Sequence, residues 1–286
     1  MPCYNEEFSV RDVVTELADK LKAMGQPFEL IAVNDGSTDG TKRILEESKI
    51  PDRIINHRSN RGYGASIKAG IRAASHEWVL IMDSDGQHPP ENVPLLTEHC
   101  GECDMVVGAR KHQSSHHWRM PGKYLLRKLC EFLVGRRIPD VNSGFRLLRK
   151  SEALKYTHLC SDQFSFSTSI TLAFMSDRLP VCFVPIDIRP RKGGNSLVNV
   201  GTGLSTFMLI LRIIGTFSPL KIFMPPTILT FVVGFSYMTW GLITEFHAGS
   251  MAVILVIVSA ILFCFGLIAD QLALLRREIS RREAGQ

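Results

Sequence analysis

The chain has too few cysteines, at too irregular a spacing, for a disulfide framework. It contains seven in 286 residues, an odd number, whereas disulfide-rich scaffolds pair an even set. Cys100 and Cys103 have the spacing of a metal-binding pair, but no second such pair follows, and structural zinc normally takes four ligands. We therefore expect two unpaired thiols here, with a metal pair as the alternative.

Strong charge and an apolar leader are lacking as well. The net charge is only +5 and the basic residues form no long run. This weak and scattered charge excludes a nucleic-acid-binding surface. It favours a membrane surface as the partner of the basic clusters near the C-terminus. The opening residues MPCYNEE contain no apolar stretch of the kind that signal peptides carry. We expect the chain to start in the cytoplasm.

Short apolar runs alternate with helical patterns up to about residue 110, and further elements follow. The predicted strands are 29–33, 53–55, 78–82, 104–109 and 181–188, and the predicted helices are 13–24, 41–48, 65–74 and 121–135. This alternation predicts an α/β fold with a mostly parallel central sheet over residues 1–200. Ligands of such sheets gather at the carboxyl ends of the strands.

Acidic loops follow two of these strands. Asp83 and Asp85 come directly after the run 78–82, and the loop Asn34-Asp35-Gly36-Ser37-Thr38-Asp39-Gly40 follows the run 30–33. An Asp-x-Asp pair alone is common in turns. Two carboxylates together with substrate phosphates are nevertheless a usual way to hold Mg²⁺, and both loops lie at strand ends. The sequence therefore predicts a nucleotide-sugar site.

Three histidines, at positions 112, 116 and 117, lie in a polar segment after the strand 104–109. They could bind a metal, but no Cys or carboxylate follows at a clear spacing. A mobile basic loop over the site is the favoured interpretation, since functional loops are often polar and irregular.

Two long uncharged runs occupy the C-terminal part. The run 222–244 has 23 residues and the run 249–269 has 21, and each exceeds the ~20 residues that cross a bilayer. Only a short joint separates them, so residues 221–286 are predicted to form a transmembrane hairpin and a basic tail. Two buried core helices are the alternative. Pro225 and Pro226 are expected to kink the first helix or to delay its start.

Basic residues flank the hairpin and are lacking in its turn. Arg212 and Lys221 precede it and Arg276, Arg277 and further arginines follow it. The positive-inside rule then places both ends of the hairpin, the catalytic domain and both termini on the cytoplasmic side. Residues 201–220 are apolar but interrupted by Arg212, which suits an interfacial helix.

Five motifs occur together in a fixed order. They are Pro2-Cys-Tyr-Asn-Glu6, Val33-Asn-Asp-Gly-Ser-Thr-Asp-Gly-Thr41, Asn60-Arg-Gly-Tyr-Gly64, Asp83-Ser-Asp-Gly-Gln-His-Pro-Pro90 and Ser143-Gly-Phe-Arg146. In this order and spacing they resemble family 2 inverting glycosyltransferases of the GT-A fold. The hairpin makes the chain similar to the polyprenyl-phosphate branch, which includes dolichyl-phosphate mannose synthases and bacterial undecaprenyl-phosphate sugar transferases.

The resemblance implies a role for each matching position on the donor side. The implied nucleotide-binding residues are Pro2, Tyr4, Glu6, Asp35, Asn60, Gly62, Gly64, Asp83 and Ser84. Asp35 would bind the base, with a turn cap as the alternative, and the glycines would let the backbone approach the nucleotide. Mg²⁺ or Mn²⁺ is the implied cofactor, held by Asp85 and Asp83, with Gln87 as a candidate further ligand.

On the acceptor side the resemblance implies cationic groups for a lipid phosphate, since an arginine fork matches phosphate oxygens. The implied residues are Arg110, Arg127, Arg146, Arg191 and Ser196. Asp83, Asp85, Arg110 and Arg146 form the implied catalytic set. Solvated surface arginines are the alternative, because most arginines are exposed.

The region where a hydroxyl-glycosylating relative would carry a catalytic base reads Phe164-Ser-Phe-Ser-Thr-Ser-Ile170, without an acid. An alcohol must lose a proton as it attacks, whereas a phosphate monoester is largely ionised near neutral pH, with a second pKa of about 6. We expect inverting, metal-dependent transfer of one sugar, of the hexosyl type, from a UDP- or GDP-sugar to polyprenyl phosphate on the cytoplasmic membrane face.

One feature departs from the family pattern. The chain begins at the first motif without the apolar strand that normally leads into it, and a central strand is expected to be lacking. A catalytically impaired membrane scaffold of the same fold is therefore one alternative function, and a polysaccharide synthase is another. The expected partners are a nucleotide sugar, the lipid phosphate and the membrane, with a second copy of the chain as an open possibility.

Overall fold

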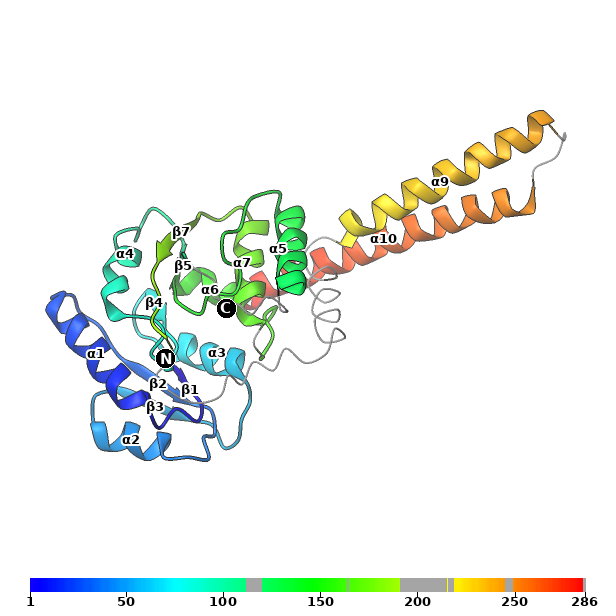
Figure 1. Ribbon diagram of the computed structural model, residues 1–286. Coiled ribbons are helices and arrows are strands. Elements are labelled where there is room, and N and C mark those ends of the chain that lie inside the picture. Colours follow the sequence, from blue (N-terminus) through cyan, green and yellow to red (C-terminus); the bar gives the residue numbers. More distant parts are fainter. Residues whose placement is uncertain (112–119, 164, 191–214, 216–218, 245–248, 285–286) are drawn as a thin grey trace. The chain divides into compact units, whose positions relative to one another are not determined.

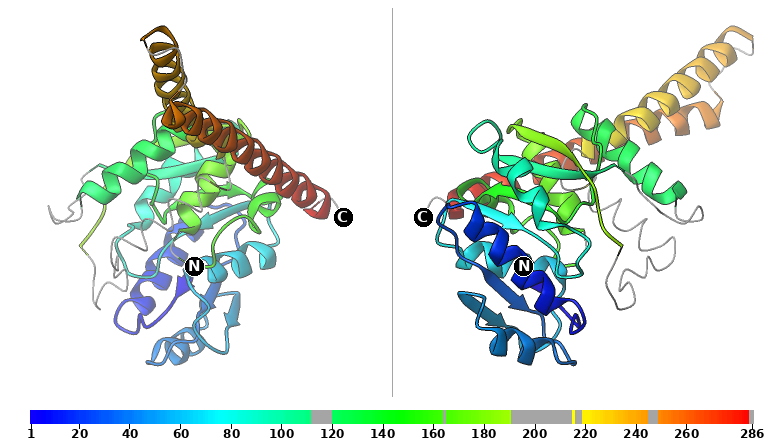
Figure 2. Two further views of the ribbon diagram at one scale, coloured as in Figure 1. Left: turned by 90° about the vertical axis from the view of Figure 1, so that its right-hand side faces the viewer. Right: turned by 60° about the vertical axis from the view of Figure 1, so that its left-hand side comes forward.

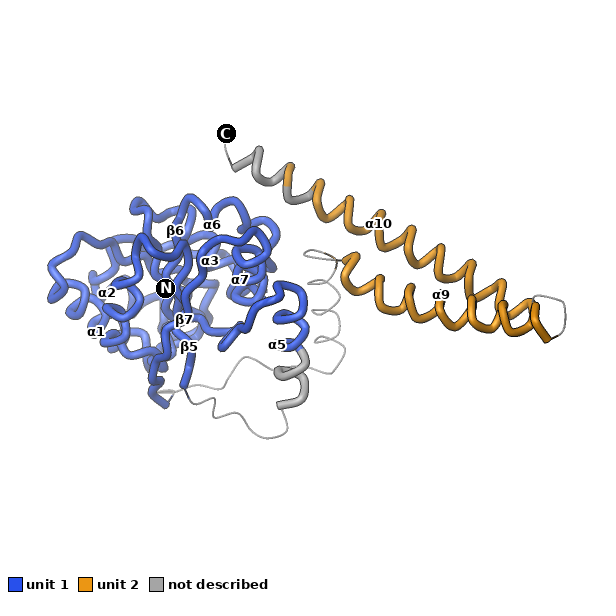
Figure 3. Tube along the Cα trace, turned by 90° about the horizontal axis from the view of Figure 1, so that it is seen from above, with its two compact units in different colours: residues 1–206 blue, residues 207–286 orange. Residues whose placement is uncertain are grey.

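The structure is a computed structural model that describes residues 1–111, 120–163, 165–190, 215, 219–244 and 249–284. The chain forms two compact units, residues 1–206 and residues 207–286 (Figure 3). The first is an α/β domain and the second is a helical hairpin. The predicted interfacial helix 201–220 falls almost wholly outside the described residues.

The first half of the α/β domain is a three-stranded parallel sheet with helical crossovers (Figure 1). Its strands, in spatial order, are β1 (Pro2–Cys3), β2 (Ile31–Asn34) and β3 (Arg53–Asn56). The connecting helices are α1 (Val10–Ala23) and α2 (Thr41–Ser48), and α3 (Tyr63–Ala73) follows β3. Each strand ends at the same edge of the sheet, as parallel strands must.

The second half is a mixed four-stranded sheet. Its strands, in spatial order, are β4 (Trp78–Ile81), β6 (Arg146–Arg149), β5 (Met105–Arg110) and β7 (Val181–Ile186). The helical elements around it are η1 (Pro90–Asn92), α4 (Val93–Thr97), α5 (Met120–Val134), α6 (Lys150–Tyr156) and α7 (Phe166–Ser176). Three of the five strand pairings of the domain are parallel, and the two that involve β6 are antiparallel.

Strand residues alternate between two apolar layers. Figure 2 gives two further views of the strands and of the helices around them. Leu30 and Ala32 belong to a buried cluster with the apolar side of α1, whereas Ile31 and Val33 belong to a second cluster with Ala69 and Ala73 of α3. Both faces of the sheet are therefore covered. Such strands read as near-continuous apolar runs rather than as alternating ones, which is the pattern that the sequence shows.

The predicted elements agree with the structure within a few residues, and α2 agrees at both ends. The strand β6 and the helices α4, α6 and α7 were not predicted. The chain does begin with a strand, the two-residue β1, which pairs with β2 through Pro2 and Cys3.

The expectation of unpaired thiols is wrong for Cys103. It forms a disulfide with Cys182 of β7, with Cα atoms 6.0 Å apart, while Cys100 is free and exposed. Because β5 and β7 are parallel neighbours, residues 79 positions apart in sequence meet there. Spacing within the CxxC segment could not reveal a partner on another strand.

The second unit consists of α9 (Pro219–Thr244) and α10 (Ser250–Ala284). Both contain a stretch long and apolar enough to cross a membrane, Pro219–Thr244 and Ser250–Leu275, and little of either is buried within the protein. Pro225 and Pro226 lie inside α9, so the start of the helix is not delayed, and the alternative, a kink, stays a prediction.

Small residues of α10 face α9 at a seven-residue interval. Ala252 and Ser259 are at most 3 % exposed, and the next position of this series, Gly266, lies against Phe223. On α9, a Cβ added at Gly234 would lie 2.7 Å from the Cβ of Leu255. Small residues let membrane helices approach closely and gain packing energy, which explains the tight hairpin.

We expect Gly234→Leu to destabilise the hairpin by about 1–3 kcal/mol, because an overpacked contact must be relieved by moving the helices apart. The measurement is reversible unfolding in mixed detergent–SDS micelles. Val233→Leu is the matched control, since Val233 is 48 % exposed. Equal stability of the two variants would contradict the packing assigned to Gly234.

Candidate active site

The ends of β1, β2 and β4 come together at one edge of the α/β domain. The Pro2 carbonyl accepts a hydrogen bond from Ser84 Oγ at 2.9 Å, and the Cys3 carbonyl accepts one from the Asp35 amide at 2.9 Å. The short strand β1 thus connects the two acidic loops that the sequence places after different strands. These loops lie close together, as their positions at strand ends predict, and their joint role as a binding site stays a prediction.

The loop after β1 is fixed by polar contacts with its neighbours. Glu6 is 8 % exposed, and the Ser9 hydroxyl lies 2.8 Å from both Glu6 Oε2 and the Ser84 carbonyl. Asn5 adopts a left-handed backbone with φ 53° and its Oδ1 accepts from the Thr38 amide at 2.9 Å. Tyr4 is half-buried beside them. Pro2, Tyr4, Glu6 and Ser84 are therefore brought together.

Asp35 organises the loop that follows β3. Its carboxylate accepts hydrogen bonds from the amides of Arg61 (3.0 Å) and Gly62 (2.8 Å) and lies 2.6 Å from His57 Nδ1. With 3 % exposure it is a buried, multiply hydrogen-bonded group, as buried carboxylates must be. The structure thus shows a loop-holding role for Asp35, while its contact with a base stays a prediction. Asn60 is exposed on the same loop.

Gly62 and Gly64 allow a close approach between two parts of the chain itself. A Cβ at Gly62, where φ is +103°, would collide with the Asp162 carbonyl, and one at Gly64 would collide with the Ser161 carbonyl. The segment 161–163 is held there by Lys68 of α3, whose Nζ donates to the Cys160 carbonyl at 2.6 Å and to Asp162 Oδ1 at 2.7 Å. The glycines are thus needed for a protein contact, and their approach to a nucleotide stays a prediction.

Asp83 lies in a cluster of buried polar groups. The Tyr63 hydroxyl donates to Asp83 Oδ1 at 2.8 Å, and His88 Nε2 lies 4.0 Å from Asp83 Oδ2. Burial raises the pKa of Asp83, whereas the Tyr63 hydrogen bond and the charge of Arg146 act in the opposite direction. His88 stacks on Phe145 at 5.2 Å between ring centroids, and burial lowers its pKa to about 4, so its ring is neutral near pH 7.

Asp83, Asp85 and Gln87 offer the oxygen donors that a hard divalent cation requires. Asp85 Oδ1 accepts from the Gln87 amide at 3.0 Å, which shapes the turn between them. Asp83 is 28 % exposed. Within the described residues, His, Cys, Asp and Glu side chains nowhere gather in threes as a metal site. Mg²⁺ commonly uses only one or two carboxylates plus substrate phosphates and waters, so this donor set fits such an ion together with a diphosphate.

Arg110 forms a bidentate ion pair that the sequence did not reveal. Its Nε and Nη2 donate to the two carboxylate oxygens of Asp140 at 2.6 and 2.9 Å, and the Asp140 side chain is 2 % exposed. Burial alone would raise the pKa of Asp140, but the Arg110 hydrogen bond outweighs it and lowers that pKa. Arg110 is 28 % exposed and its charge also acts on Asp83.

Arg146 lies entirely inside the protein, with 0 % exposure. Its guanidinium donates to the Ser143 carbonyl, to the Ser167 carbonyl at 3.0 Å and to Thr171 Oγ1 at 3.1 Å. These contacts connect the start of β6 to α7. They favour a structural and electrostatic role next to Asp83, and direct contact with a lipid phosphate stays a prediction.

Of the three other residues predicted to bind the acceptor phosphate, the structure describes one. Arg127 lies half-buried in α5. Arg191 and Ser196, and the histidines 112, 116 and 117, lie outside the described residues.

We expect Tyr63→Phe to raise the KM for the nucleotide sugar by about tenfold or more, because a hydrogen bond to a charged group contributes about 1.5–3 kcal/mol and each 1.4 kcal/mol is a factor of ten; this hydrogen bond orients Asp83. Steady-state kinetics with varied donor measure the change. Tyr156→Phe is the matched control, since the Tyr156 hydroxyl donates to Asp177 at 2.6 Å elsewhere in the domain. A KM raised equally in both variants would refute the role.

Solved structures define the fold class of the α/β unit. The chain is similar to glucosyl-3-phosphoglycerate synthase from Mycobacterium tuberculosis with a TM-score of 0.60 and 21 % identity, over 74 % of this chain and 76 % of that one. A further structure of that enzyme, in complex with Mn²⁺, UDP and glucosyl-3-phosphoglycerate, gives a TM-score of 0.58 at 21 % identity, over 74 % of this chain and 76 % of that one. The fold is therefore GT-A-like, and at this identity the likeness extends to the fold alone.

Residues 1–156 match the family model of glycosyl transferase family 2, and residues 218–275 match that of the GtrB C-terminal hairpin. The chain belongs to glycosyl transferase family 2. The first match contains both acidic loops and the β6 strand, and the second coincides with α9 and most of α10.

Curated relatives carry the name undecaprenyl-phosphate 4-deoxy-4-formamido-L-arabinose transferase. The protein from Proteus mirabilis is 33 % identical over 155 residues, 52 % of this chain and 48 % of its own. The one from Edwardsiella ictaluri is 27 % identical over 201 residues, 68 % of this chain and 61 % of its own. The chain thus spans about half to three fifths of the length of these relatives.

Proposed function

We propose that this protein transfers a single sugar from a nucleotide sugar to polyprenyl phosphate at the cytoplasmic face of a membrane, with inversion at the anomeric carbon. The proposal depends on one observation. Asp83 and Asp85, which follow β4, and the Arg110–Asp140 pair at the end of β5 lie at the same edge of the sheet. Carboxylates for a metal–diphosphate and a partly exposed arginine for a second phosphate are what such a reaction needs.

On the donor side, Asp83, Asp85 and Gln87 would hold Mg²⁺ or Mn²⁺. When bound, the ion neutralises charge on the departing nucleoside diphosphate. Tyr63 keeps Asp83 oriented through its 2.8 Å hydrogen bond, and the turn between Asp85 and Gln87 is shaped by their 3.0 Å contact. This preorganisation means that little rearrangement accompanies donor binding.

On the acceptor side, the described residues include cationic groups. In the stretch where a base for a hydroxyl acceptor is expected, they include no carboxylate. The nearest acid to the stretch 164–170, Asp162, is ion-paired with Lys68 at 2.7 Å, and this hydrogen bond lowers the Asp162 pKa. A carboxylate so engaged is a poor proton acceptor. A phosphate monoester needs none, because it is already largely ionised at neutral pH. The chemistry of the site therefore favours a phosphate nucleophile over a hydroxyl.

The relatives and the hairpin support a lipid acceptor. The names of the curated relatives contain undecaprenyl phosphate and a formamido-arabinose, whereas the sequence expectation was a transferase of the hexosyl type. Because specificity depends on pocket shape, both sugar types belong in the test. The apolar helices α9 and α10 would keep the enzyme at the surface where such a lipid resides.

The test is transfer of radiolabel to undecaprenyl or dolichyl phosphate in detergent, with a panel of UDP- and GDP-sugars that includes UDP-4-deoxy-4-formamido-L-arabinose, in the presence of Mg²⁺ or Mn²⁺. We expect one donor to yield a labelled, mild-acid-labile lipid. Metal-dependent binding of a nucleotide sugar without any product would favour the scaffold alternative. Product from an unphosphorylated polyprenol at an equal rate would refute the phosphate acceptor.

We further expect both termini to be cytoplasmic, because Lys and Arg flank the hairpin and its turn residues 245–250 contain neither. Reporter tags at each end, one active only in the cytoplasm and one only outside it, measure this. An external C-terminus would refute the paired crossing of α9 and α10.

A further inference from the structure

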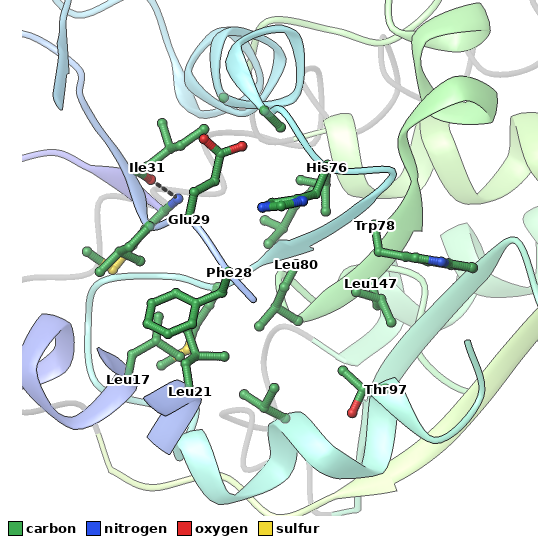
Figure 4. A pocket seen from close by; sticks show the side chains of 18 of the residues that line it. Leu17, Leu21, Phe28, Glu29, Ile31, His76, Trp78, Leu80, Thr97 and Leu147 are labelled. Atoms are coloured by element: carbon green, nitrogen blue, oxygen red, sulfur yellow. Dashed lines mark hydrogen bonds between the residues drawn. The ribbon is translucent and has the colours of Figure 1, made fainter. Parts of the chain in front are cut away.

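The α/β domain contains an apolar cavity of about 800 Å³ between β2 and β4, and Phe28, Leu80 and Leu147 are among the side chains around it (Figure 4). The described residues that line this cavity include no Lys or Arg. This interior space therefore offers apolar surface but no cationic side chain for an anionic or zwitterionic ligand.

Another cavity, of about 840 Å³, lies in the helical hairpin. It runs along one side of α9 from Leu220 to Val232 and is bordered on α10 by Asp270. We call this space the hairpin groove. Unlike the interior cavity, the hairpin groove combines apolar surface with one basic and one acidic side chain, Lys221 and Asp270.

Each of the two apolar stretches of the hairpin contains a single charged side chain. In Pro219–Thr244 it is Lys221, and in Ser250–Leu275 it is Asp270. Charged residues within membrane-spanning segments are costly and rare, and they usually mark a functional site. The two single charges of the two helices line the same groove, which makes the hairpin groove the candidate for such a site.

Lys221 and Asp270 lie near the same end of the hairpin. Gly266 of α10 packs against Leu220 of α9, so Asp270 lies one helical turn beyond this contact. At a rise of about 1.5 Å per residue, Asp270 is about 7.5 Å from the end of its apolar stretch at Leu275. Asp270 is half-buried, and it forms no ion pair or hydrogen bond with the residues that the structure describes. A cation from outside the chain would stabilise this carboxylate.

The rest of the hairpin groove fits a hydrocarbon chain. Ile228, Leu229 and Val232 line it and are 53 %, 65 % and 53 % exposed. The distance along α9 from Leu220 to Val232 is about 18 Å, slightly more than half of the ~30 Å thickness of the hydrocarbon core of a bilayer. An acyl chain of one leaflet can therefore lie along this side of α9 while its headgroup stays beside Lys221.

We propose that the hairpin groove binds a phospholipid with a primary ammonium headgroup, phosphatidylethanolamine. The Asp270 carboxylate accepts hydrogen bonds from the ammonium group, the Lys221 ammonium binds the phosphate diester, and one acyl chain lies along α9. Charge-assisted hydrogen bonds of this kind are short and strong. The inference concerns the hairpin as a membrane-spanning unit and stands apart from the proposed reaction.

The charges of the groove distinguish this lipid from others. A zwitterionic headgroup supplies a partner to Asp270 and to Lys221 at once, whereas an anionic lipid would leave the Asp270 carboxylate without a counter-charge. A choline headgroup carries the same charges but has no N–H group to donate. Binding should therefore depend on the number of N–H donors on the headgroup and on the charge at position 270.

The test is lipid binding to the full chain, delipidated in detergent and measured by native mass spectrometry. The lipids have identical acyl chains and form a methylation series from phosphatidylethanolamine through its N-methyl and N,N-dimethyl forms to phosphatidylcholine. We expect affinity to fall along the series, by about tenfold or more between its two ends, because a hydrogen bond to a charged group acts on this scale. Equal binding of all members would overturn the proposal.

Two variants separate the two halves of the headgroup. Asp270→Asn should remove the dependence on methylation and lower the affinity for phosphatidylethanolamine to that for phosphatidylcholine. Lys221→Gln should weaken all members by a similar factor, because all of them carry the phosphate. The matched control is Glu278→Gln, which removes an acid of α10 beyond its apolar stretch and should leave the series unchanged.

Unfolding in mixed detergent–SDS micelles verifies that each variant keeps the hairpin, and the series on the unmodified protein tests the proposal even where a variant unfolds. A methylation dependence that survives in Asp270→Asn would refute the assigned contact with the ammonium group. Displacement of phosphatidylethanolamine by an equal concentration of polyprenyl phosphate would also refute the proposal, since the groove would then belong to the acceptor lipid.

Discussion

Replacing Asp85 with asparagine is expected to lower kcat/KM for sugar transfer by about 10³-fold, the scale on which removal of one charge-stabilising group acts. Asparagine is isosteric and can still accept the hydrogen bond that the Gln87 amide donates to Asp85 Oδ1 at 3.0 Å. The turn should therefore survive while the negative charge is lost. Transfer assays over a range of Mg²⁺ and Mn²⁺ concentrations measure the effect, and the thermal midpoint should change little.

Glu91→Gln provides the control for this prediction. Glu91 lies shortly after the same loop, its side chain is 66 % exposed, and it pairs with Arg189 at 3.1 Å. An exposed pair of this kind contributes little, so the control should retain nearly full activity. If Asp85→Asn kept the activity of the control at all metal concentrations, the metal-binding role of Asp85 would be wrong.

The acidic loops could be predicted from the sequence because each is a local feature that follows a buried apolar run. The elements that were missed lack such a pattern. β6 has four residues with an arginine at each end, and Arg146 is buried rather than exposed. α7 is buried on almost every side and combines serines and threonines with apolar residues, so it shows no apolar stripe of the kind that marks an amphipathic helix.

The partners of the site residues could not be predicted, because they come from distant parts of the chain. Tyr63 is 20 positions from Asp83, and Asp140 is 30 positions from Arg110. Tyr63 lies within a recognised motif, but nothing in that motif indicates which carboxylate its hydroxyl reaches. For Asp140, the sequence showed only that an acidic residue lies close to the motif Ser143-Gly-Phe-Arg146. Pairing of this kind depends on which strands become neighbours, and β6 was the strand that the sequence did not reveal.

The same limitation explains the glycines and the buried arginine. A motif shows that a residue type is required at Gly62, Gly64 and Arg146, but not what it touches. In the structure the glycines accommodate the segment 161–163, and Arg146 holds Ser143, Ser167 and Thr171 together. Residue requirements in this site therefore combine ligand binding with the packing that shapes the loops.

Replacing Asp140 with asparagine is expected to destabilise the α/β domain by about 3 kcal/mol, because it leaves a largely desolvated arginine without its counter-charge. Arg110 loses a bidentate partner at 2.6 and 2.9 Å, and transfer activity should fall as well, since the guanidinium would no longer be held at the end of β5. The thermal midpoint should drop by about 8 °C, at about 2–4 °C for each kcal/mol. Asp187→Asn, which breaks the exposed pair with Lys111, should cost less than about 1 kcal/mol.

The dependence on pH separates loss of the ion pair from simple mispacking. The pKa of Asp140 is depressed below its ordinary 3.8, so the carboxylate stabilises the fold fully above that value, and this contribution is lost as the pH falls through the folded-state pKa. The stability gap between the unmodified protein and Asp140→Asn should therefore be constant from pH 7 to about pH 5 and should narrow below about pH 4. A double variant with Arg110→Gln should recover part of the lost stability, because it no longer carries an unpaired charge. A gap that is independent of pH, with no recovery in the double variant, would show that Asp140 acts through packing alone.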